Sequence, residues 1–308
     1  MKASARSAPR SDATPALPPE IRPGQSIALL QHLHILTREG RLNQDSRRKL
    51  KQVYHLFGFI EGPLKALWEE RQARGDTAPI TLADHGAGKS YLGFIVHDLF
   101  FKPLQQASGR AAGCVYGIET RPELVQSSRE LAARLGFDTM RFLNLSVQQA
   151  LKSDELPAQV DMVTALHACD TATDDAIAFG LQRQARYIVL VPCCQAEVAA
   201  SLRRTKALSL SRTSLAELWR HPLQTREFGS HVTNVMRCLY LEAMGYQVTV
   251  TELVGWEHSM KNELILATRT GQRKRSAAQR LQELVETFGL QEVAAIRYPM
   301  EAEPQAPA

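Results

Sequence analysis

Short apolar runs and longer amphipathic stretches alternate along the chain after residue 75. Each run is rich in β-branched and aliphatic residues, and most of the stretches between them repeat apolar residues at helical spacing. The runs predict seven strands, at 79–84, 113–118, 139–144, 160–166, 186–192, 246–253 and 262–268. Strands that alternate with helices form a mostly parallel sheet with helices on both faces. The pattern therefore predicts an α/β fold.

The connection between the last two runs differs from the others. It is too short for a right-handed crossover, so we expect the last strand to run antiparallel. Between the fifth and sixth runs, residues 195–245 are long enough for two or three helices in place of one. The predicted architecture is a Rossmann-like, doubly wound, mostly parallel seven-stranded sheet with an antiparallel last strand.

A segment with helical periodicity precedes the predicted sheet. Apolar residues recur at helical spacing from 24 to 75, and Gly62-Pro63 predicts a break within this segment. The first residues are rich in Ala, Ser, Pro and Arg and are typical of a disordered tail. We therefore divide the chain into a tail, an N-terminal helical segment, an α/β domain with a helical insertion at 195–245, and a C-terminal helix and tail. Their ranges are 1–23, 24–75, 76–270 and 271–308.

The positive charge of the chain is concentrated before the sheet. The net charge is +5, and residues 1–53 hold ten Lys/Arg against four Asp/Glu, which accounts for all of the excess. On a helix Arg47, Lys51 and Tyr54 share one face, where cations could bind phosphates while the aromatic ring stacks on a base. This face favours RNA as a partner. A solvated helix surface is the alternative interpretation.

Composition excludes some classes of protein. No run of about 18 apolar residues is present, so we expect no membrane span. The five cysteines form no CxxC pair, and no secretory signal precedes them, which predicts a reduced, cytoplasmic setting. Nothing in the pattern indicates the oligomeric state.

The loop after the first strand, "TLADHGAGKSYLGF" (81–94), is compatible with two nucleotide ligands. An ATP-binding P-loop needs a glycine where Ala83 stands, and the carboxylate of Asp84 would repel a triphosphate. The second ligand, S-adenosylmethionine, carries an ammonium group that an acidic loop attracts. In this interpretation Asp84 begins the loop and small residues let the backbone pass close to the ligand, although Ser90 stands where a third glycine is usual. The small residues are Gly86, Ala87 and Gly88.

The next two strand ends fit the same ligand. Glu119 ends the second strand, where a carboxylate can accept hydrogen bonds from both ribose hydroxyls. Leu145 and Ser146 follow the third strand, near the place of the adenine amino group. We therefore expect S-adenosylmethionine, and not ATP, as the cofactor.

Two polar loops follow the fourth and fifth strands. The first, "LHACDTATD", supplies His167 and Asp170 as candidates for the base that removes a proton from the accepting atom, and His167 also as a cofactor contact. Asp174 in this loop is interpreted as the cap of the next helix. Because parallel strands end at one edge of a sheet, both loops should border the cofactor.

The second loop, "VPCCQ", holds Cys193 and Cys194. Buried cysteines at a strand end are commonly inert, small apolar residues. A covalent catalytic role and a metal site with Cys169 and His167 are the sharper alternatives. Adjacent cysteines are poorly placed to share one tetrahedral metal, so we expect no metal.

The motifs "DHGAGKSYL", "LHACDTATDDA" and "VPCCQ" together resemble one group of class I S-adenosylmethionine-dependent methyltransferase domains. The group includes methyltransferase-like proteins, the glutathione S-transferase C-terminal domain-containing protein and the zinc-knuckle tRNA 2′-O-methyltransferase. The resemblance covers roughly residues 45 to 268. Asp170 stands where the group commonly has glycine, and the zinc-knuckle spacings are absent, so that tRNA activity does not carry over.

The resemblance implies a methyltransferase fold at 76–270 and S-adenosylmethionine as the methyl donor. A turn before the last strand, "GWEHSMKNELI", also resembles that group and offers substrate contacts at Trp256, His258, Lys261 and Asn262. The predicted function is methyl transfer to RNA, either tRNA or rRNA. Methylation of protein or a small molecule, and a catalytically silent RNA- or protein-binding module, are the alternatives.

Overall fold

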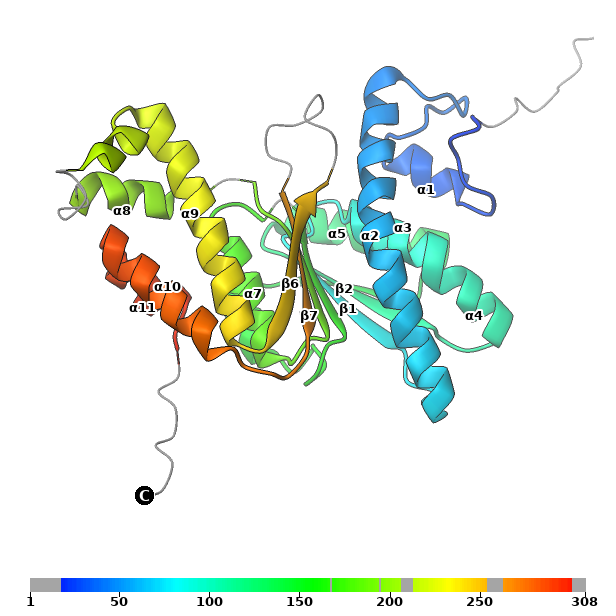
Figure 1. Ribbon diagram of the computed structural model, residues 1–308. Coiled ribbons are helices and arrows are strands. Elements are labelled where there is room, and N and C mark those ends of the chain that lie inside the picture. The colour runs from blue at the N-terminus through cyan, green and yellow to red at the C-terminus, as the bar shows by residue number, and fades with distance from the viewer. Residues whose placement is uncertain (1–17, 167, 194, 206–212, 254–262, 301–308) are drawn as a thin grey trace, which may run out of the picture.

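The computed structural model describes residues 18–166, 168–193, 195–205, 213–253 and 263–300. Its centre is a seven-stranded sheet in the order β3-β2-β1-β4-β5-β7-β6, seen nearly edge-on in Figure 1. The strands are β1 Ile80–His85, β2 Gly113–Glu119, β3 Met140–Asn144, β4 Met162–Leu166, β5 Tyr187–Val191, β6 Tyr246–Glu252 and β7 Glu263–Arg269. Neighbours from β3 to β5 pair in parallel, whereas β7 pairs antiparallel with both β5 and β6. The predicted fold, including its antiparallel last strand, is confirmed.

Helices cover both faces of the sheet (Figure 1). The α-helices before the insertion are α1 Ile27–His32, α2 Gln44–Arg74, α3 Tyr91–Val96, α4 Lys102–Ser108, α5 Pro122–Leu135, α6 Val147–Lys152 and α7 Ala172–Gln182. The insertion holds α8 Glu197–Thr205, the 3-10 helix η2 Ser214–Trp219 and α9 Pro222–Ala243, and the chain ends with α10 Arg275–Phe288 and α11 Gln291–Arg297. One π-helical turn, η1 His97–Phe101, joins α3 to α4. Two of these helices, α2 and α9, exceed 20 residues.

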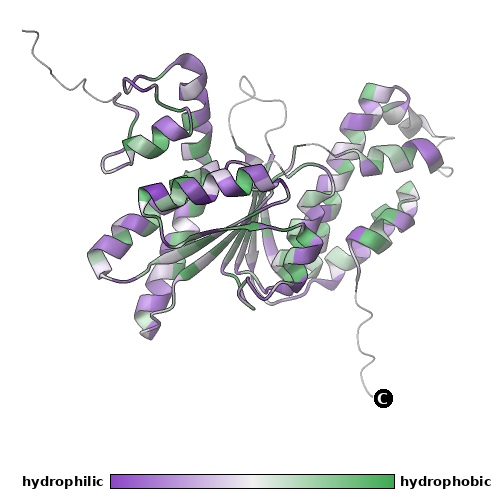
Figure 2. Ribbon diagram, turned by 180° about the vertical axis from the view of Figure 1, so that it is seen from behind, coloured by the Kyte–Doolittle hydropathy of each residue, from purple (hydrophilic) through white to green (hydrophobic). Residues whose placement is uncertain are grey.

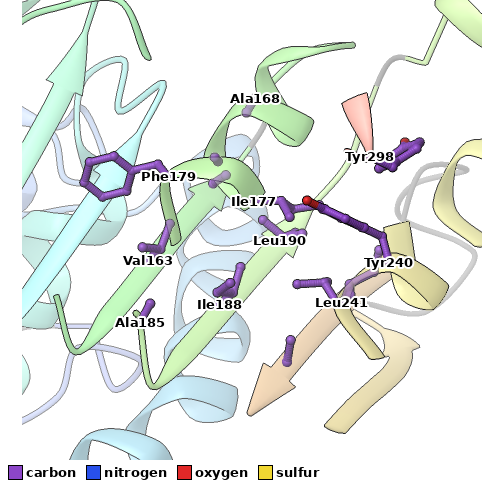
Figure 3. Close-up of a cluster of buried hydrophobic side chains, with 14 of the residues drawn as sticks. Val163, Ala168, Ile177, Phe179, Ala185, Ile188, Leu190, Tyr240, Leu241 and Tyr298 are labelled. Atoms are coloured by element: carbon purple, nitrogen blue, oxygen red, sulfur yellow. The ribbon is translucent and has the colours of Figure 1, made fainter. Parts of the chain in front are cut away.

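Alternation along the strands divides the core into two layers. Val189 and Val191 of β5 pack with α1, α2, α3 and α5, while Ile188 and Leu190 pack with the helices from α6 onwards. Successive side chains of a strand point to opposite faces, so a fully apolar run supplies both layers. Figure 3 shows part of the second layer, and Figure 2 shows the apolar residues gathered toward the sheet.

Hydrogen bonds and an ion pair join the N-terminal segment to the core. The hydroxyl of Tyr91 donates to the carbonyl of Leu33 at 3.0 Å, and the amide of Ser26 donates to Asp98 at 2.8 Å. At the far end of α2 the guanidinium of Arg71 binds both carboxylate oxygens of Asp161 at 2.7 Å. These contacts hold the segment against the same face of the sheet as α3 and α5.

The predicted break at Gly62-Pro63 is wrong, because α2 continues through Pro63 from Gln44 to Arg74. Proline removes one backbone hydrogen bond and crowds the preceding turn. Here a buried stripe that includes Ile60 and Leu64 packs on the sheet on both sides of the proline. Tertiary packing therefore outweighs the local signal.

We expect Pro63→Ala to stabilise the protein by about 1–3 kcal/mol, since it restores an interior helix bond and relieves the crowding. Gly62→Ala is the matched control, because an added Cβ there meets no atom within 4 Å. It should contribute about 1 kcal/mol through helix propensity alone. Urea unfolding of both variants measures the difference. A Pro63→Ala variant no more stable than the parent protein would contradict a continuous helix at this position.

Candidate functional site

The glycine loop leaves β1 at His85 and turns sharply back toward β2. Gly86 and Gly88 have left-handed backbones, with φ of 64° and 58°, which glycine adopts without steric cost. The amide of Ala87 donates to the carbonyl of Ile118 at 3.1 Å, so the loop is tied to the neighbouring strand. A Cβ at Gly86 would lie 3.7 Å from Ala168, which shows that the loop after β4 lies against this turn.

The backbone conformation of Ser90 explains why a third glycine is usual at this position of the loop. Its φ is 51°, a left-handed conformation that costs a residue with a Cβ about 1–2 kcal/mol. The side chain is fully buried, and its hydroxyl has no hydrogen-bond partner among the described residues. The departure noted in the sequence is therefore a strained position within the loop.

Asp84 is a buried carboxyl at the end of β1. It is 2% exposed, and the hydroxyl of Thr164 on β4 donates to it at 2.7 Å. Burial raises the pKa of Asp84 to about 7, and the charge of Glu119 adds to the rise, while the bond from Thr164 opposes it. The group is therefore poised between its neutral and ionised forms near neutral pH. The sequence predicted Asp84 but not its partner Thr164.

Glu119, at the end of β2, has the opposite protonation behaviour. Burial favours its neutral form, but hydrogen bonds from Arg121 and from the amide of Gly88 outweigh this and lower the pKa to about 2. The Gly88 amide donates to Oε2 at 2.8 Å, and the Arg121 guanidinium donates to both oxygens at 3.0 and 3.1 Å. The carboxylate thus joins the glycine loop to the end of β2.

The residues at the end of β3 and after it form a helix cap and a hydrogen bond to the backbone of β2. Ser146 caps α6: its hydroxyl accepts from the Gln149 amide at 3.3 Å, and its own amide donates to the Gln149 side chain at 2.8 Å. Asn144, which the sequence pattern did not single out, donates to the carbonyl of Glu119 at 3.0 Å. It pairs with Glu119 in the sheet register, so the strand-end position was the signal that could have found it. Leu145, between them, is partly buried.

The loop after β4 is shaped by Asp170. Its φ is 51°, which explains why glycine is common at this position in the resembled group. Its carboxylate Oδ1 accepts hydrogen bonds from the amides of Ala196 at 2.9 Å and Glu197 at 3.4 Å, at the start of α8. Asp170 therefore joins the loops after β4 and β5. Its role as a base stays a prediction, and it would fall to Oδ2, because Oδ1 accepts the two amides.

Asp174 does not cap α7, because the N-cap is Thr171. Instead its carboxylate forms a buried ion pair with Arg237 of α9, with hydrogen bonds of 2.6 and 2.8 Å. The hydroxyl of Tyr298, beyond α11, donates to Asp174 at 2.9 Å. A buried cation of this kind attracts a carboxylate more strongly than a helix N-terminus does.

The two cysteine-bearing loops meet at the sheet edge. The sulfur atoms of Cys169 and Cys193 lie 3.3 Å apart. His167 and Cys194 lie outside the described residues, as do Trp256, His258, Lys261 and Asn262. No group of three or more metal-binding side chains exists in the described part of the chain.

The helix face predicted to bind substrate is already engaged within the protein. Arg47 forms an ion pair with Glu20 at 2.8 Å, and the guanidinium of Arg22 lies 4.8 Å above the ring of Tyr54. One face of that ring is therefore covered by a cation of the same chain. Lys51 is exposed beside them.

A comparison with known protein families identifies the family of the chain. A model of a family described as a methyltransferase domain matches residues 48–201, half of the chain. The chain belongs to this methyltransferase family. It is an S-adenosylmethionine-dependent methyltransferase. The match begins within α2, which belongs to the N-terminal segment, and ends in α8.

Solved structures with a similar arrangement share little sequence with the chain. A fibrillarin pre-rRNA processing protein from Methanococcus jannaschii is 12% identical, with a TM-score of 0.38 over 63% of this chain and 68% of that chain. Magnesium protoporphyrin IX methyltransferase from Synechocystis, with bound S-adenosylhomocysteine, is 14% identical, with a TM-score of 0.39 over 80% and 96%. Precorrin-6y C5,15-methyltransferase from Geobacter metallireducens is 17% identical, with a TM-score of 0.35 over 63% and 82%. No curated protein matches the chain.

Across the described residues, no helix combines the length and apolar character needed to cross a membrane.

The residues present fit the methyl donor. The left-handed glycines keep side chains away from the turn, so a ligand can approach the backbone closely. When bound, S-adenosylmethionine supplies an electrophilic methyl group. Asp84 would hold its ammonium group, and Glu119 would hold its ribose hydroxyls.

We expect Glu119→Ala to weaken S-adenosylmethionine binding at least about tenfold, because each charge-assisted hydrogen bond contributes about 1.5–3 kcal/mol. Isothermal titration calorimetry measures the affinity. Arg129→Ala is a control for general damage, since its guanidinium donates to the carbonyl of Phe142 and not to Glu119. Unchanged donor affinity in Glu119→Ala would exclude the ribose assignment.

Donor affinity should also depend on the protonation of Asp84. The folded-state pKa is raised from 3.8 to about 7, so the stability that neutral Asp84 contributes is complete below pH 3.8 and is lost as pH rises through 7. A bound ammonium group favours the ionised form, so affinity should rise about tenfold between pH 5.5 and 7.5. Asp84→Asn should remove this rise in calorimetric titrations. A pH dependence that persists in Asp84→Asn would assign it to another group.

Proposed function

We propose that the protein transfers the methyl group of S-adenosylmethionine to RNA. The observation that carries this proposal is the position of the basic N-terminal segment, which is bonded to the core next to the donor loop. Tyr91 begins α3 directly after that loop, and its hydroxyl binds the backbone of the segment at Leu33. Cations at this position would attract the phosphate backbone of a nucleic acid toward the donor.

The chain has three tasks in such a reaction. Asp84, Glu119 and the glycine loop would bind the donor, and the loops after β4 and β5 would border its methyl group. The basic segment would hold the RNA so that its accepting atom reaches the methyl group. Asp170, with one carboxylate oxygen not occupied by α8, and His167 remain candidates to accept the proton.

The proposal divides the chain into an RNA-binding N-terminal segment at 24–75 and a catalytic unit at 76–270. It includes membership of the group that contains the zinc-knuckle tRNA enzyme. It also includes a reducing, cytoplasmic setting. Protein or small-molecule methylation is the second candidate function. The exposed Leu218 and Leu223 beside the start of α9 are apolar groups of a kind that a protein partner would cover.

The test supplies the purified protein with methyl-labelled S-adenosylmethionine and, in parallel, total RNA and total protein from cells that lack the gene. We expect the label to enter RNA, to be released by ribonuclease, and to be lost with Glu119→Ala. Label in the protein fraction alone would favour the second candidate. Donor binding without label in either fraction would favour a small-molecule substrate or a catalytically silent module.

A further inference from the structure

A cavity of ≈ 790 Å³ lies between the N-terminal segment and α5. One wall is formed by α1 and the turn that follows it, the other by α5, and Lys89 of the donor loop contributes at one end. Figure 1 labels α1 and α5, the two helices whose residues line this cavity. The cavity therefore reaches the methyl-donor loop.

The lining of this cavity is basic. Its ionisable side chains are His32, His34, Arg38, Lys89 and Arg134, and the described lining includes no Asp or Glu. Neither Arg38 nor Lys89 forms an ion pair with a residue that the structure describes, and Arg134 donates to the Nδ1 of His32 at 3.2 Å. On α2, by contrast, Arg47 pairs with Glu20 and Arg48 pairs with Asp45. The cations of the cavity differ from those of α2 in lying beside the donor loop, and not in lacking acidic neighbours, since the charge of Arg38 acts on Glu39.

The field of these cations acts on His32. Burial lowers the pKa of His32, and the charges of Arg134, His34 and Lys89 lower it further. Burial is the larger cause, and the contribution of the neighbouring cations agrees with the basic lining of the cavity. Anions are attracted to such a position.

Lys89 gives the link to the reaction. It follows Gly88, whose amide binds Glu119, so Lys89 belongs both to the donor loop and to the lining of the cavity. The same lysine completes the "GAGKS" motif that resembles a P-loop. The motif does not fit ATP, but its lysine is placed to bind a phosphate of another molecule.

We infer that this cavity holds phosphate groups of the RNA substrate, bound by Arg38, Lys89 and Arg134. The inference rests on the proposed function, and it moves the RNA-binding surface from the predicted face of α2 to the cavity beside it. Two partly exposed apolar side chains of the lining, Leu124 and Leu135, offer surface for ribose and bases, whereas Leu33, Leu36 and Leu131 are buried beneath them.

The exposure of the cations favours a polymer over a small anion. His34, Arg38, Lys89 and Arg134 are all exposed at the rim, and none is enclosed. Sites for small ligands bury most of the ligand surface and place their polar groups inside. A nucleic acid instead passes over exposed cations, which bind successive phosphates.

The experiment compares two variants with a matched control. Arg38→Gln/Arg134→Gln removes two cavity cations without touching the donor loop, and Lys89→Gln removes the third. Arg74→Gln/Arg280→Gln removes two exposed cations outside the cavity, each in a surface ion pair of small energetic weight. Filter binding of labelled total tRNA across a salt series measures affinity and its salt slope, and calorimetry measures S-adenosylmethionine binding.

We expect Arg38→Gln/Arg134→Gln to weaken RNA binding at least about tenfold at 0.1 M salt and to reduce the salt slope by about 1.4, or about 0.7 for each phosphate that is no longer neutralised. Lys89→Gln should reduce the slope by about 0.7. Donor affinity of the double variant should equal that of the parent protein, which shows that it is folded. The control should bind RNA like the parent protein.

Each other outcome overturns the inference in a recognisable way. If the parent protein binds tRNA and the cavity variants bind it as tightly as the control does, the phosphates bind elsewhere and the proposed function stands. If inorganic tripolyphosphate binds and only its binding depends on the cavity cations, the cavity serves a small anion. If the parent protein neither retains nor methylates any RNA, the proposed function fails together with the inference.

Discussion

A single buried guanidinium organises the catalytic edge of the sheet. Arg237 is fully buried, and a buried charge that lacks a partner costs about 3–5 kcal/mol. Asp174 neutralises it through two hydrogen bonds, and the carbonyl of Asp170 and the side chain of Asn234 accept two more. Tyr298 then donates to the same aspartate. Because every one of these bonds has to be made, α7, α9 and the chain end after α11 are held in one arrangement.

This constraint also acts on the loops after β4 and β5, which we expect to border the methyl donor. Arg237 holds the backbone of Asp170, whose left-handed conformation turns its carboxylate toward the first amides of α8. The loop after β4 is thereby joined to the loop after β5, which brings Cys169 and Cys193 into contact. Tyr298 also packs on Tyr240, with ring centroids 5.4 Å apart (Figure 3), so the C-terminal helices support the site from outside the sheet. An active-site edge built from separate loops needs such a support to keep a fixed geometry.

The features that the sequence could predict depend on short spacing. The seven strands follow from short apolar runs, and the donor loop follows from glycines placed directly after a strand that carries Asp84 near its end. Glu119 was predictable because it ends the next strand. The ion pair of Asp174 was not, since its partner lies 63 residues away and an aspartate near a helix start has a commoner local use. The basic cavity was hidden for the same reason, because its cations come from 32–38, Lys89 and α5 and meet only after the N-terminal segment has docked.

The ionisable groups around the glycine loop differ in charge from one side of the loop to the other. Two carboxyl groups lie at the ends of the adjacent strands β1 and β2, and their protonation differs because Arg121 and a backbone amide stabilise only Glu119 in its ionised form. With its pKa raised to about 7, Asp84 is only partly ionised near neutral pH, so the repulsion between the two carboxyl groups is reduced until a cation arrives. The methyl donor brings that cation, and the positive groups of the cavity begin one residue beyond Gly88. A cationic donor and an anionic RNA would thus meet across the glycine loop, each attracted by charges of opposite sign, and the loop itself would separate the two fields.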